Sequence, residues 1–254
     1  MENSNPSTHS RLAIVTGGMG GLGEAICHHL AAMGMRVVTT YSPGNDHSDE
    51  WLMQQQRKGF LFHAHGIDVS DYASCVSCVA AIVAEMGPVD VLVNNAGITR
   101  DVSMRKMTLD DWQAVVHTNL DSVFNMTKQV LDGMVDRQWG RIINISSVNG
   151  QKGSFGQANY AAAKAGIHGF TKSLALEVAK KGVTVNTVSP GYLRTQMVLK
   201  VPEDILKSKI LPEIPIGRLG EPDEVAGLVA YLASAQAAFV TGANLAINGG
   251  QHMY

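Results

Sequence analysis

The sequence predicts an α/β fold in which one doubly wound parallel sheet carries helices on both of its faces. Short apolar runs rich in β-branched residues alternate with longer segments of helical periodicity along the 254 residues. The first run, RLAIVT at 11–16, is followed by a glycine-rich stretch and then by a helical pattern. Such alternation is typical of β-α-β units, whose strands are parallel because each helix returns the chain to the same end of the sheet.

The individual elements follow from the same two patterns. Strands are expected where short apolar runs are bounded by polar or turn residues, at 11–16, 36–40, 60–66, 90–94, 141–146, 183–188 and 243–247. Helices are expected where apolar residues recur with a 3.6-residue period, at 22–33, 71–86, 108–135 (in two pieces), 157–180 and 222–234.

No proline- or serine-rich linker interrupts this alternation, so residues 11–254 are expected to form one domain. Residues 1–10 are polar, unlike a signal peptide, and are expected to form a short disordered leader. Residues 190–222 break the alternation, because they are rich in proline and lysine and have weak periodicity. We expect this segment to form a lid over the substrate.

Composition argues against several classes of protein. Twenty basic and twenty-two acidic residues give a formal net charge of −2, which is unlike the basic surface of a nucleic-acid binder. No apolar stretch approaches the length of a membrane span. We therefore expect a cytoplasmic protein with neither nucleic acid nor membrane as a partner.

Two short patterns could indicate redox or metal chemistry. Cys75 and Cys78 form a C-x-x-C, but they fall inside the predicted helix 71–86, where no basic neighbour would stabilise a thiolate. His63 and His65 would share one face of a strand, but no third ligand stands at metal-site spacing. Neither a redox pair nor a metal site is predicted.

The glycine-rich loop after the first predicted strand is the candidate dinucleotide site. Its sequence fits both G-x-G-x-x-G and T-G-x-x-x-G-x-G, and a helical pattern follows at once. Glycines there let the backbone turn sharply and approach a pyrophosphate at the positive end of that helix. No G-K-S/T follows, which argues against a nucleoside-triphosphate loop. The candidate cofactor-binding residues of this loop are Gly17, Gly18, Gly20, Gly21, Leu22 and Gly23.

A second small-residue turn, Asn94-Asn95-Ala96-Gly97, ends the strand at 90–94. Ligands of doubly wound sheets gather at the carboxyl ends of the strands, so this turn is expected beside the glycine loop. A plain turn remains the alternative.

Three residues have the chemistry that carbonyl reduction requires. Tyr160 and Lys164 lie four residues apart in one predicted helix and so share a face. An isolated tyrosine has a pKa of about 10, and a nearby ammonium group would favour the phenolate and bring it closer to a useful range. Ser147 follows a predicted strand and could polarise the carbonyl group. Taken alone, Y-x-x-x-K is also a common pattern of amphipathic helices.

In combination, these motifs resemble the classical short-chain dehydrogenase/reductase family over residues 11–250. The glycine loop, N-N-A-G, Asn119, Ser146-Ser147, Y-A-A-A-K and Ser189-Pro190-Gly191 occur in that order. The resemblance implies a single Rossmann-type doubly wound parallel sheet with helices on both faces, a homotetramer, and NADH or NADPH as the cofactor.

The resemblance also implies a role for each matching residue. Ser147, Tyr160 and Lys164 match the catalytic triad, with Lys164 also contacting the nicotinamide ribose. Asn119 matches a structural asparagine that helps hold a proton-relay water. The remaining cofactor contacts that it implies are Asp68 at the adenine, Asn94, Ala96 and Gly97 in the turn, and Pro190 and Gly191 beside the nicotinamide.

Within the family, the chain is similar to the acetoacetyl-CoA reductases of polyhydroxybutyrate synthesis. The similarity is carried by five segments, at 97–101, 139–153, 155–157, 189–192 and 248–252. It implies reduction of acetoacetyl-CoA, an acyl-CoA substrate, to (R)-3-hydroxybutanoyl-CoA. The residues that it places against the substrate are Asp101, Ser147, Phe155, Gln157 and Tyr192.

Three alternatives stay open at this point. Reductases of 3-oxoacyl thioesters on acyl carrier protein share nearly every motif, and Arg137, Arg141 and Lys152 would supply a basic docking surface for that carrier. A non-catalytic dinucleotide sensor is opposed by the complete triad. A scaffold at storage granules is opposed by the lack of an amphipathic surface helix or an apolar low-complexity tract.

The cofactor choice depends on the end of the second predicted strand. A 2′-phosphate usually requires an arginine or lysine there, yet none occurs between Arg36 and Arg57, and three acidic residues do. This favours NADH. The acid that usually binds the NAD ribose is also missing, since Thr40 stands near that position, although Asp46 could substitute and a protonated His47 could meet a phosphate. Dual use of the two cofactors remains the alternative.

Overall fold

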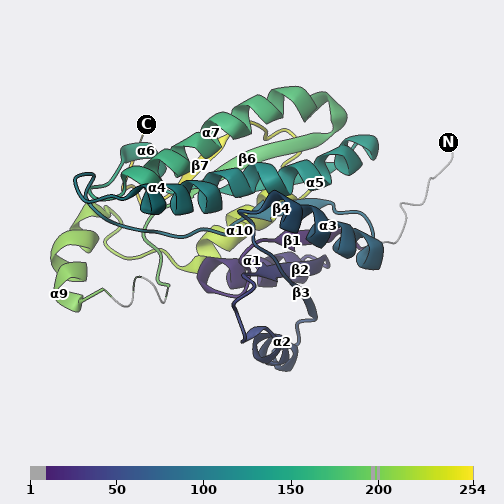
Figure 1. Ribbon diagram of the computed structural model, residues 1–254, viewed down its shortest axis with the longest axis horizontal. Helices are drawn as coiled ribbons and strands as arrows, with labels where there is room; N and C mark the ends of the chain where they lie inside the picture. The colour runs from purple at the N-terminus through teal and green to yellow at the C-terminus, as the bar shows by residue number, and fades with distance from the viewer. Residues whose placement is uncertain (1–9, 196–197, 199–200, 254) are drawn as a thin grey trace.

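One sheet of seven parallel strands organises the protein (Figure 1). The computed structural model describes residues 10–195, 198 and 201–253. The strands are β1 (Leu12–Val15), β2 (Arg36–Tyr41), β3 (Phe62–Gly66), β4 (Val91–Asn94), β5 (Gly140–Ile145), β6 (Val183–Pro190) and β7 (Asn244–Ile247). Their order is β3-β2-β1-β4-β5-β6-β7, and every neighbouring pair is parallel. The order reverses between β1 and β4, which is where sheets of this type bind ligands.

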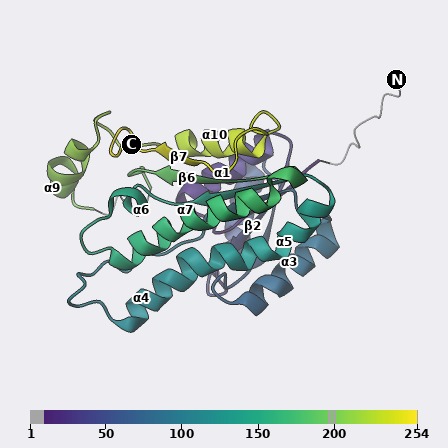
Figure 2. The ribbon, with the colours of Figure 1, turned by 90° about the horizontal axis from the view of Figure 1, so that it is seen from above.

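Helices cover both faces of the sheet (Figure 2). α1 (Gly21–Ala32) and α10 (Pro222–Ala233) pack on one face, and α3 (Tyr72–Met86), α5 (Ser122–Asp136) and α7 (Ala158–Val178) pack on the other. Each face has its own apolar core. The strands β1, β4, β5 and β6 are therefore buried along their whole length, which explains the continuous apolar runs at β1 and β4, whereas β3 and β7 at the two edges are only partly buried. The predicted fold is confirmed.

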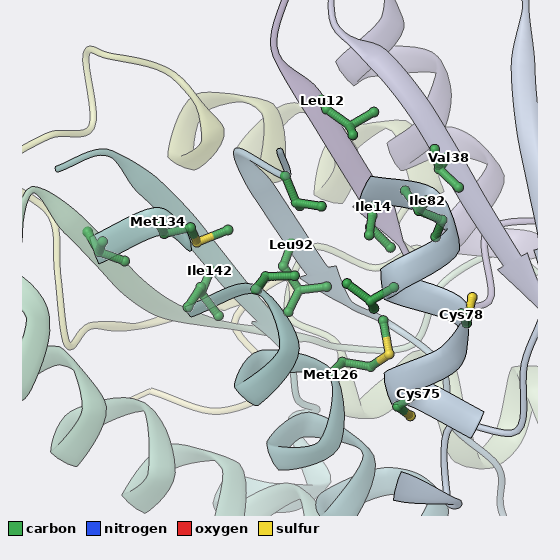
Figure 3. Close-up of a cluster of buried hydrophobic side chains, with 14 of the residues drawn as sticks. Leu12, Ile14, Val38, Cys75, Cys78, Ile82, Leu92, Met126, Met134 and Ile142 are labelled. Carbon is green, nitrogen blue, oxygen red and sulfur yellow. The ribbon is translucent and has the colours of Figure 1, made fainter. Parts of the chain in front are cut away.

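The core beneath α3 and α5 also contains two of the three cysteines (Figure 3). Cys75 and Cys78 are free and buried among side chains that include Ile82 and Met126. Burial raises the pKa of both thiols, that of Cys75 to about 12. Because neither thiol ionises near neutral pH, the C-x-x-C is part of the packing.

The seven predicted strands and five predicted helical segments are present, with ends that differ by a residue or two. The segment predicted as two helical pieces contains α4 (Leu109–Val116) and α5, joined by a π-helical turn, η1 (His117–Asp121). Among the described residues before β6, two α-helices were not predicted, α2 (Ser48–Arg57) and α6 (Asn149–Lys152).

The segment expected to be a lid leaves the sheet after β6. Leu193 pairs with Gly220 in an isolated parallel bridge, and short helical turns lie between them. These turns are α9 (Glu203–Ile205), η3 (Leu206–Ile210) and η4 (Leu211–Glu213). α9 and α6 lie at the same end of the molecule (Figures 1 and 2). Residues 196, 197, 199 and 200 of this segment, and residues 1–9 of the expected leader, lie outside the described residues.

The sequence predicted neither a membrane span nor a metal site. Within residues 10–195, 198 and 201–253, no helix is long and apolar enough to cross a membrane. The same residues contain no group of three or more histidine, cysteine, aspartate or glutamate side chains that could hold a metal ion. His63 and His65 each approach a carboxylate oxygen of Glu85, at 3.6 Å.

Candidate active site

A cavity of about 640 Å³ opens at the reversal point of the sheet, between the carboxyl ends of β1 and β4. The glycine loop, the end of β2, the start of the segment after β3 and the turn after β4 form its walls. Its lining includes Gly17, Met19, Gly20, Tyr41, Asn45, Asp68, Asn95, Ala96 and Gly97.

The glycine loop has the backbone geometry that a dinucleotide requires. Gly17 has φ +64°, a left-handed conformation that favours glycine. A Cβ on Gly23 would lie 2.3 Å from the Gly17 carbonyl oxygen, so only glycine allows α1 to start this close to the loop. α1 begins at Gly21 with no side-chain cap on its backbone N–H groups. Free N–H donors at a helix N-terminus are suited to a pyrophosphate, so the residues present fit the expected cofactor.

The turn after β4 uses its two asparagines differently. Asn95 lines the cavity and donates from Nδ2 to the carbonyl oxygens of Thr16 and Gly17, which ties the turn to the glycine loop. Asn94 is buried, and its amide donates to Asn144 at 2.8 Å. The structure therefore places Asn95, which the sequence reasoning did not select, at the cavity, and directs the selected Asn94 into the core.

A second cavity, of about 290 Å³, continues from the first and shares Asn95, Gly97 and Ile98 with it. Its lining brings together most of the residues predicted for catalysis and substrate binding. These are Ser147, Gln157, Tyr160, Lys164 and Tyr192, and the predicted cofactor contacts Leu22, Pro190 and Gly191 line the same cavity.

Tyr160 and Ser147 both line the smaller cavity. Tyr160 lies in the first turn of α7, and Ser147 follows β5. Burial of Tyr160 raises its pKa, a hydrogen bond with the Ser147 side chain opposes this, and the negative charge of Asp101 adds to the rise. The net direction is upward, so the sequence-based expectation of a lowered tyrosine pKa is not met in this structure. Tyr160 is a protonated hydroxyl donor near neutral pH.

Lys164 is almost completely enclosed, with 4% of its surface exposed. Its ammonium group donates to the Ile145 carbonyl at 2.7 Å and lies 5.7 Å from the centre of the Tyr160 ring. Burial lowers the pKa of Lys164 to about 8. The ammonium group also lies near Gly97, where it faces the point at which the two cavities meet.

Asn119 holds the loop that lines both cavities. It lies in the π-helical turn η1, is 1% exposed, and binds the backbone of Ile98 twice. Its Oδ1 accepts from the Ile98 N–H and its Nδ2 donates to the Ile98 carbonyl, each at 2.8 Å. The side chain therefore holds the loop that both cavities share.

The residues predicted to contact substrate are only partly brought together. Gln157 lines the smaller cavity, donates to Asp101 at 2.7 Å and accepts from Asn149 at 2.8 Å. Asp101 does not line the cavity itself but contacts Gln157, which does. Phe155 lies in the loop before α7, is 95% exposed and does not line the cavity.

The end of β2 forms one wall of the larger cavity. Tyr41, Ser42, Pro43 and Asn45 line it, with no basic side chain. The Thr40 hydroxyl accepts a hydrogen bond from Gly17 N–H at 3.4 Å.

Asp46 and His47, the two side chains considered for the ribose or a phosphate, do not line the cavity. His47 Nε2 lies 3.3 Å from Asp46 and its Nδ1 lies 3.9 Å from Glu50, and both side chains are exposed.

Comparison with known proteins agrees with this geometry. Residues 11–206 match the model of the family described as short chain dehydrogenase. The chain is 58% identical to an acetoacetyl-CoA reductase of Cupriavidus necator, over 96% of this chain and 98% of that protein. It is 55% identical to nodulation protein G of Azospirillum brasilense, over 94% and 97%. It is 46% identical to the 3-oxoacyl-[acyl-carrier-protein] reductase FabG of Vibrio cholerae, over 96% and 98%.

A family match over more than half of the chain, together with relatives similar over nearly their full length, identifies the family that the sequence motifs indicated. The chain belongs to the short-chain dehydrogenase family.

Proposed function

We propose that the protein reduces acetoacetyl-CoA to (R)-3-hydroxybutanoyl-CoA with a nicotinamide dinucleotide. The observation that carries the proposal is the convergence of Ser147, Tyr160 and Lys164 on a cavity that continues into the larger one. The similarity to the Cupriavidus necator acetoacetyl-CoA reductase supports the choice of substrate. The dinucleotide, when bound, supplies the hydride that forms the new C–H bond at carbon 3.

The protein's own residues handle the oxygen of that carbonyl. Ser147 donates a hydrogen bond that polarises the carbonyl, and Tyr160 donates its phenolic proton as the negative charge develops on the oxygen. The raised pKa of Tyr160 keeps that proton in place near neutral pH. Lys164 is positioned at the junction of the cavities, where its ammonium group can bind the nicotinamide ribose and stabilise the phenolate that remains.

The larger cavity is proposed to hold the dinucleotide along the glycine loop, with Asp68 at the adenine end and Ala96 and Gly97 beside the middle. We propose that NADH is the preferred form. The wall after β2 offers no basic side chain to a 2′-phosphate, and the His47 imidazole lies outside the lining. A dianion there would have no basic partner among the described lining residues.

Reduction of carrier-protein thioesters is the second candidate, because the Vibrio cholerae relative carries that activity in its name. The three basic residues considered for carrier docking have other partners. Arg137 and Arg141 donate to backbone carbonyls, Arg141 is 3% exposed, and Lys152 pairs with Glu213 at 2.8 Å. This favours the coenzyme A thioester.

The homotetramer and the lid are also proposals. Exposed apolar side chains on α4, α5 and α7, namely Leu109, Trp112, Phe124 and Leu176, are suited to contacts between copies of the chain. Tyr192, Leu193 and Thr195 supply the lid side of the smaller cavity. Sedimentation velocity tests the homotetramer, and protection of the 190–222 segment from protease by bound substrate tests the lid. A cytoplasmic location fits a protein that uses these metabolites, and cell fractionation tests it.

One assay matrix tests the function. Acetoacetyl-CoA and an acetoacetyl carrier protein are each supplied with NADH and with NADPH, and kcat/KM is measured for the four combinations. We expect the highest value with acetoacetyl-CoA and NADH, and a product of (R) configuration on chiral analysis. A higher kcat/KM with the carrier-bound thioester would favour the second candidate, and a higher value with NADPH would contradict the cofactor proposal alone.

A further inference from the structure

His168 is a half-buried histidine that the proposed mechanism does not use. It lies on α7 one turn beyond Lys164, which in turn lies one turn beyond Tyr160. Residues spaced by four share a face of a helix, so His168 extends the row formed by the two proposed catalytic side chains. It does not line either cavity. Its imidazole points into the seam between α7 and the ends of β5 and β6.

Two serine hydroxyls meet the imidazole in that seam. His168 Nε2 lies 2.9 Å from Ser146 Oγ and 3.4 Å from Ser189 Oγ. Both serines are buried, with 3% and 0% of their surface exposed. Ser189 also donates to the Asn244 side chain at 2.7 Å.

The contacts of Ser146 determine which ring nitrogen carries the proton. Ser146 Oγ lies 2.8 Å from the Lys164 carbonyl oxygen, which can only accept a hydrogen bond. A hydroxyl has one hydrogen, so Ser146 uses it for Lys164 and can only accept from His168. His168 Nε2 must therefore carry a hydrogen and donate it to Ser146. Burial and the nearby Lys172 lower the pKa of His168, which favours a neutral ring with its proton on Nε2.

This chain of hydrogen bonds reaches the proposed active site at two points. Ser146 precedes Ser147 directly and lines the smaller cavity itself. Lys164 is bound to the same strand end from its other side, since its ammonium group donates to the Ile145 carbonyl. His168 therefore orients the serine that joins the backbone of Lys164 to the segment that carries Ser147.

We propose that His168 is a positioning residue. Its Nε2–H fixes the Ser146 hydroxyl on the Lys164 carbonyl and thereby holds Ser147 and Lys164 in fixed positions relative to each other. The proposal rests on the reductase function proposed above. Loss of the His168 contact is expected to lower kcat more than it weakens binding. The reason is that small displacements of a polarising serine weaken contacts that strengthen in the transition state.

The test compares His168→Leu, which removes the donor, with His168→Gln, whose amide N–H can still donate. With acetoacetyl-CoA we expect His168→Leu to lower kcat about five-fold, as for loss of one neutral hydrogen bond, with KM and dinucleotide Kd changed less than about two-fold. His168→Gln should keep most of kcat. A leucine variant with wild-type kcat, or equal losses in both variants, would contradict the proposal.

A double-mutant cycle with Ser146→Ala tests whether His168 acts through that serine. In the Ser146→Ala background, His168→Leu should lower kcat little further. Full additivity of the two losses in kcat would show that the two residues act independently. Melting temperatures of the single variants separate a loss of folding from a loss of positioning.

A second readout does not depend on turnover. Nitrogen chemical shifts of labelled histidine should show His168 as the neutral Nε2–H form in the wild type, with faster exchange of that proton in Ser146→Ala. A proton on Nδ1 instead would overturn the proposal. If the wild type did not reduce acetoacetyl-CoA while His168 showed the expected form, the function would be wrong and the positioning contact would stand.

Discussion

Replacing Lys164 with methionine should make the protein more stable near neutral pH while removing its activity. Burial lowers the pKa of Lys164 from 10.5 to about 8. The folded protein therefore holds this proton less tightly than the unfolded chain does, and folding with the lysine charged carries a cost in free energy. Methionine has a similar length and no charge, so it escapes that cost.

The size of the effect follows from the fall in pKa. At about 1.4 kcal/mol for each pKa unit, the cost at pH 7 is about 3 kcal/mol, because Lys164 is charged there in both states. The lost hydrogen bond to the Ile145 carbonyl opposes this, since a bond from a charged donor contributes about 1.5–3 kcal/mol. The net gain at pH 7 is then about 1 kcal/mol, or about 2–4 °C in melting temperature.

The dependence on pH is the sharper part of the prediction. Between pH 8 and 10.5 the unfolded wild type binds more protons than the folded wild type, so its stability rises with pH. The methionine variant has no such term. The variant should therefore lose about 2 kcal/mol of its relative stability between pH 7 and about pH 9.5 and become the less stable protein.

Urea unfolding followed by tryptophan fluorescence, at fixed protein concentration and without added dinucleotide, measures both values. Lys172→Met is the matched control, because Lys172 lies on the same helix but is exposed. That control should show no comparable change. A stability difference between Lys164→Met and wild type that is the same at both pH values would refute the reasoning.

Three further outcomes follow from the structure. Tyr160→Phe should lower kcat by a factor of about 10²–10⁴ and leave dinucleotide affinity intact. A non-catalytic dinucleotide sensor would also keep its dinucleotide affinity in this variant, but its wild type would show no turnover. Gly23→Ala should abolish dinucleotide binding in calorimetry, because its Cβ would meet a backbone oxygen at 2.3 Å, while Gly169→Ala on α7, whose Cβ meets nothing within 4 Å and which lines neither cavity, should bind. Cys75 and Cys78 should resist a thiol reagent at pH 7 until urea unfolds the protein.

The sheet was predictable because both of its faces are covered. Strands buried on two sides are mostly apolar, as in β1 and β4, and such runs stand out in a sequence. α2 gave no such signal. Only Trp51 and Gln55 are buried in its ten residues, and His47 provides no side-chain cap at its start. Its position is fixed by contacts with distant residues, such as the bond from Trp51 to Glu24.

The placement of some active-site residues was predictable from the sequence, and that of others was not. The placement of Tyr160 and Lys164 on one face follows from helical spacing alone. The choice between Asn94 and Asn95 does not, because it depends on the residue at which β4 ends and on the direction of its last side chain. The position of Phe155 depends on a loop bounded by Gly153 and Gly156, both with positive φ, and no periodic pattern describes such a loop.

The π-helical turn η1 has a consequence for how the chain could change by deletion. A π turn contains one residue more than an α-helical turn would, and each residue of an α-helix rotates the chain by about 100°. Removing any one residue from His117–Asp121 would let α4 and α5 join as one regular helix. It would also rotate α4 by about a quarter turn relative to α5 and carry the Asn119 amide away from Ile98. The helical phase of this segment, set by the number of residues and independent of any one side chain, therefore determines whether the loop shared by the two cavities is held.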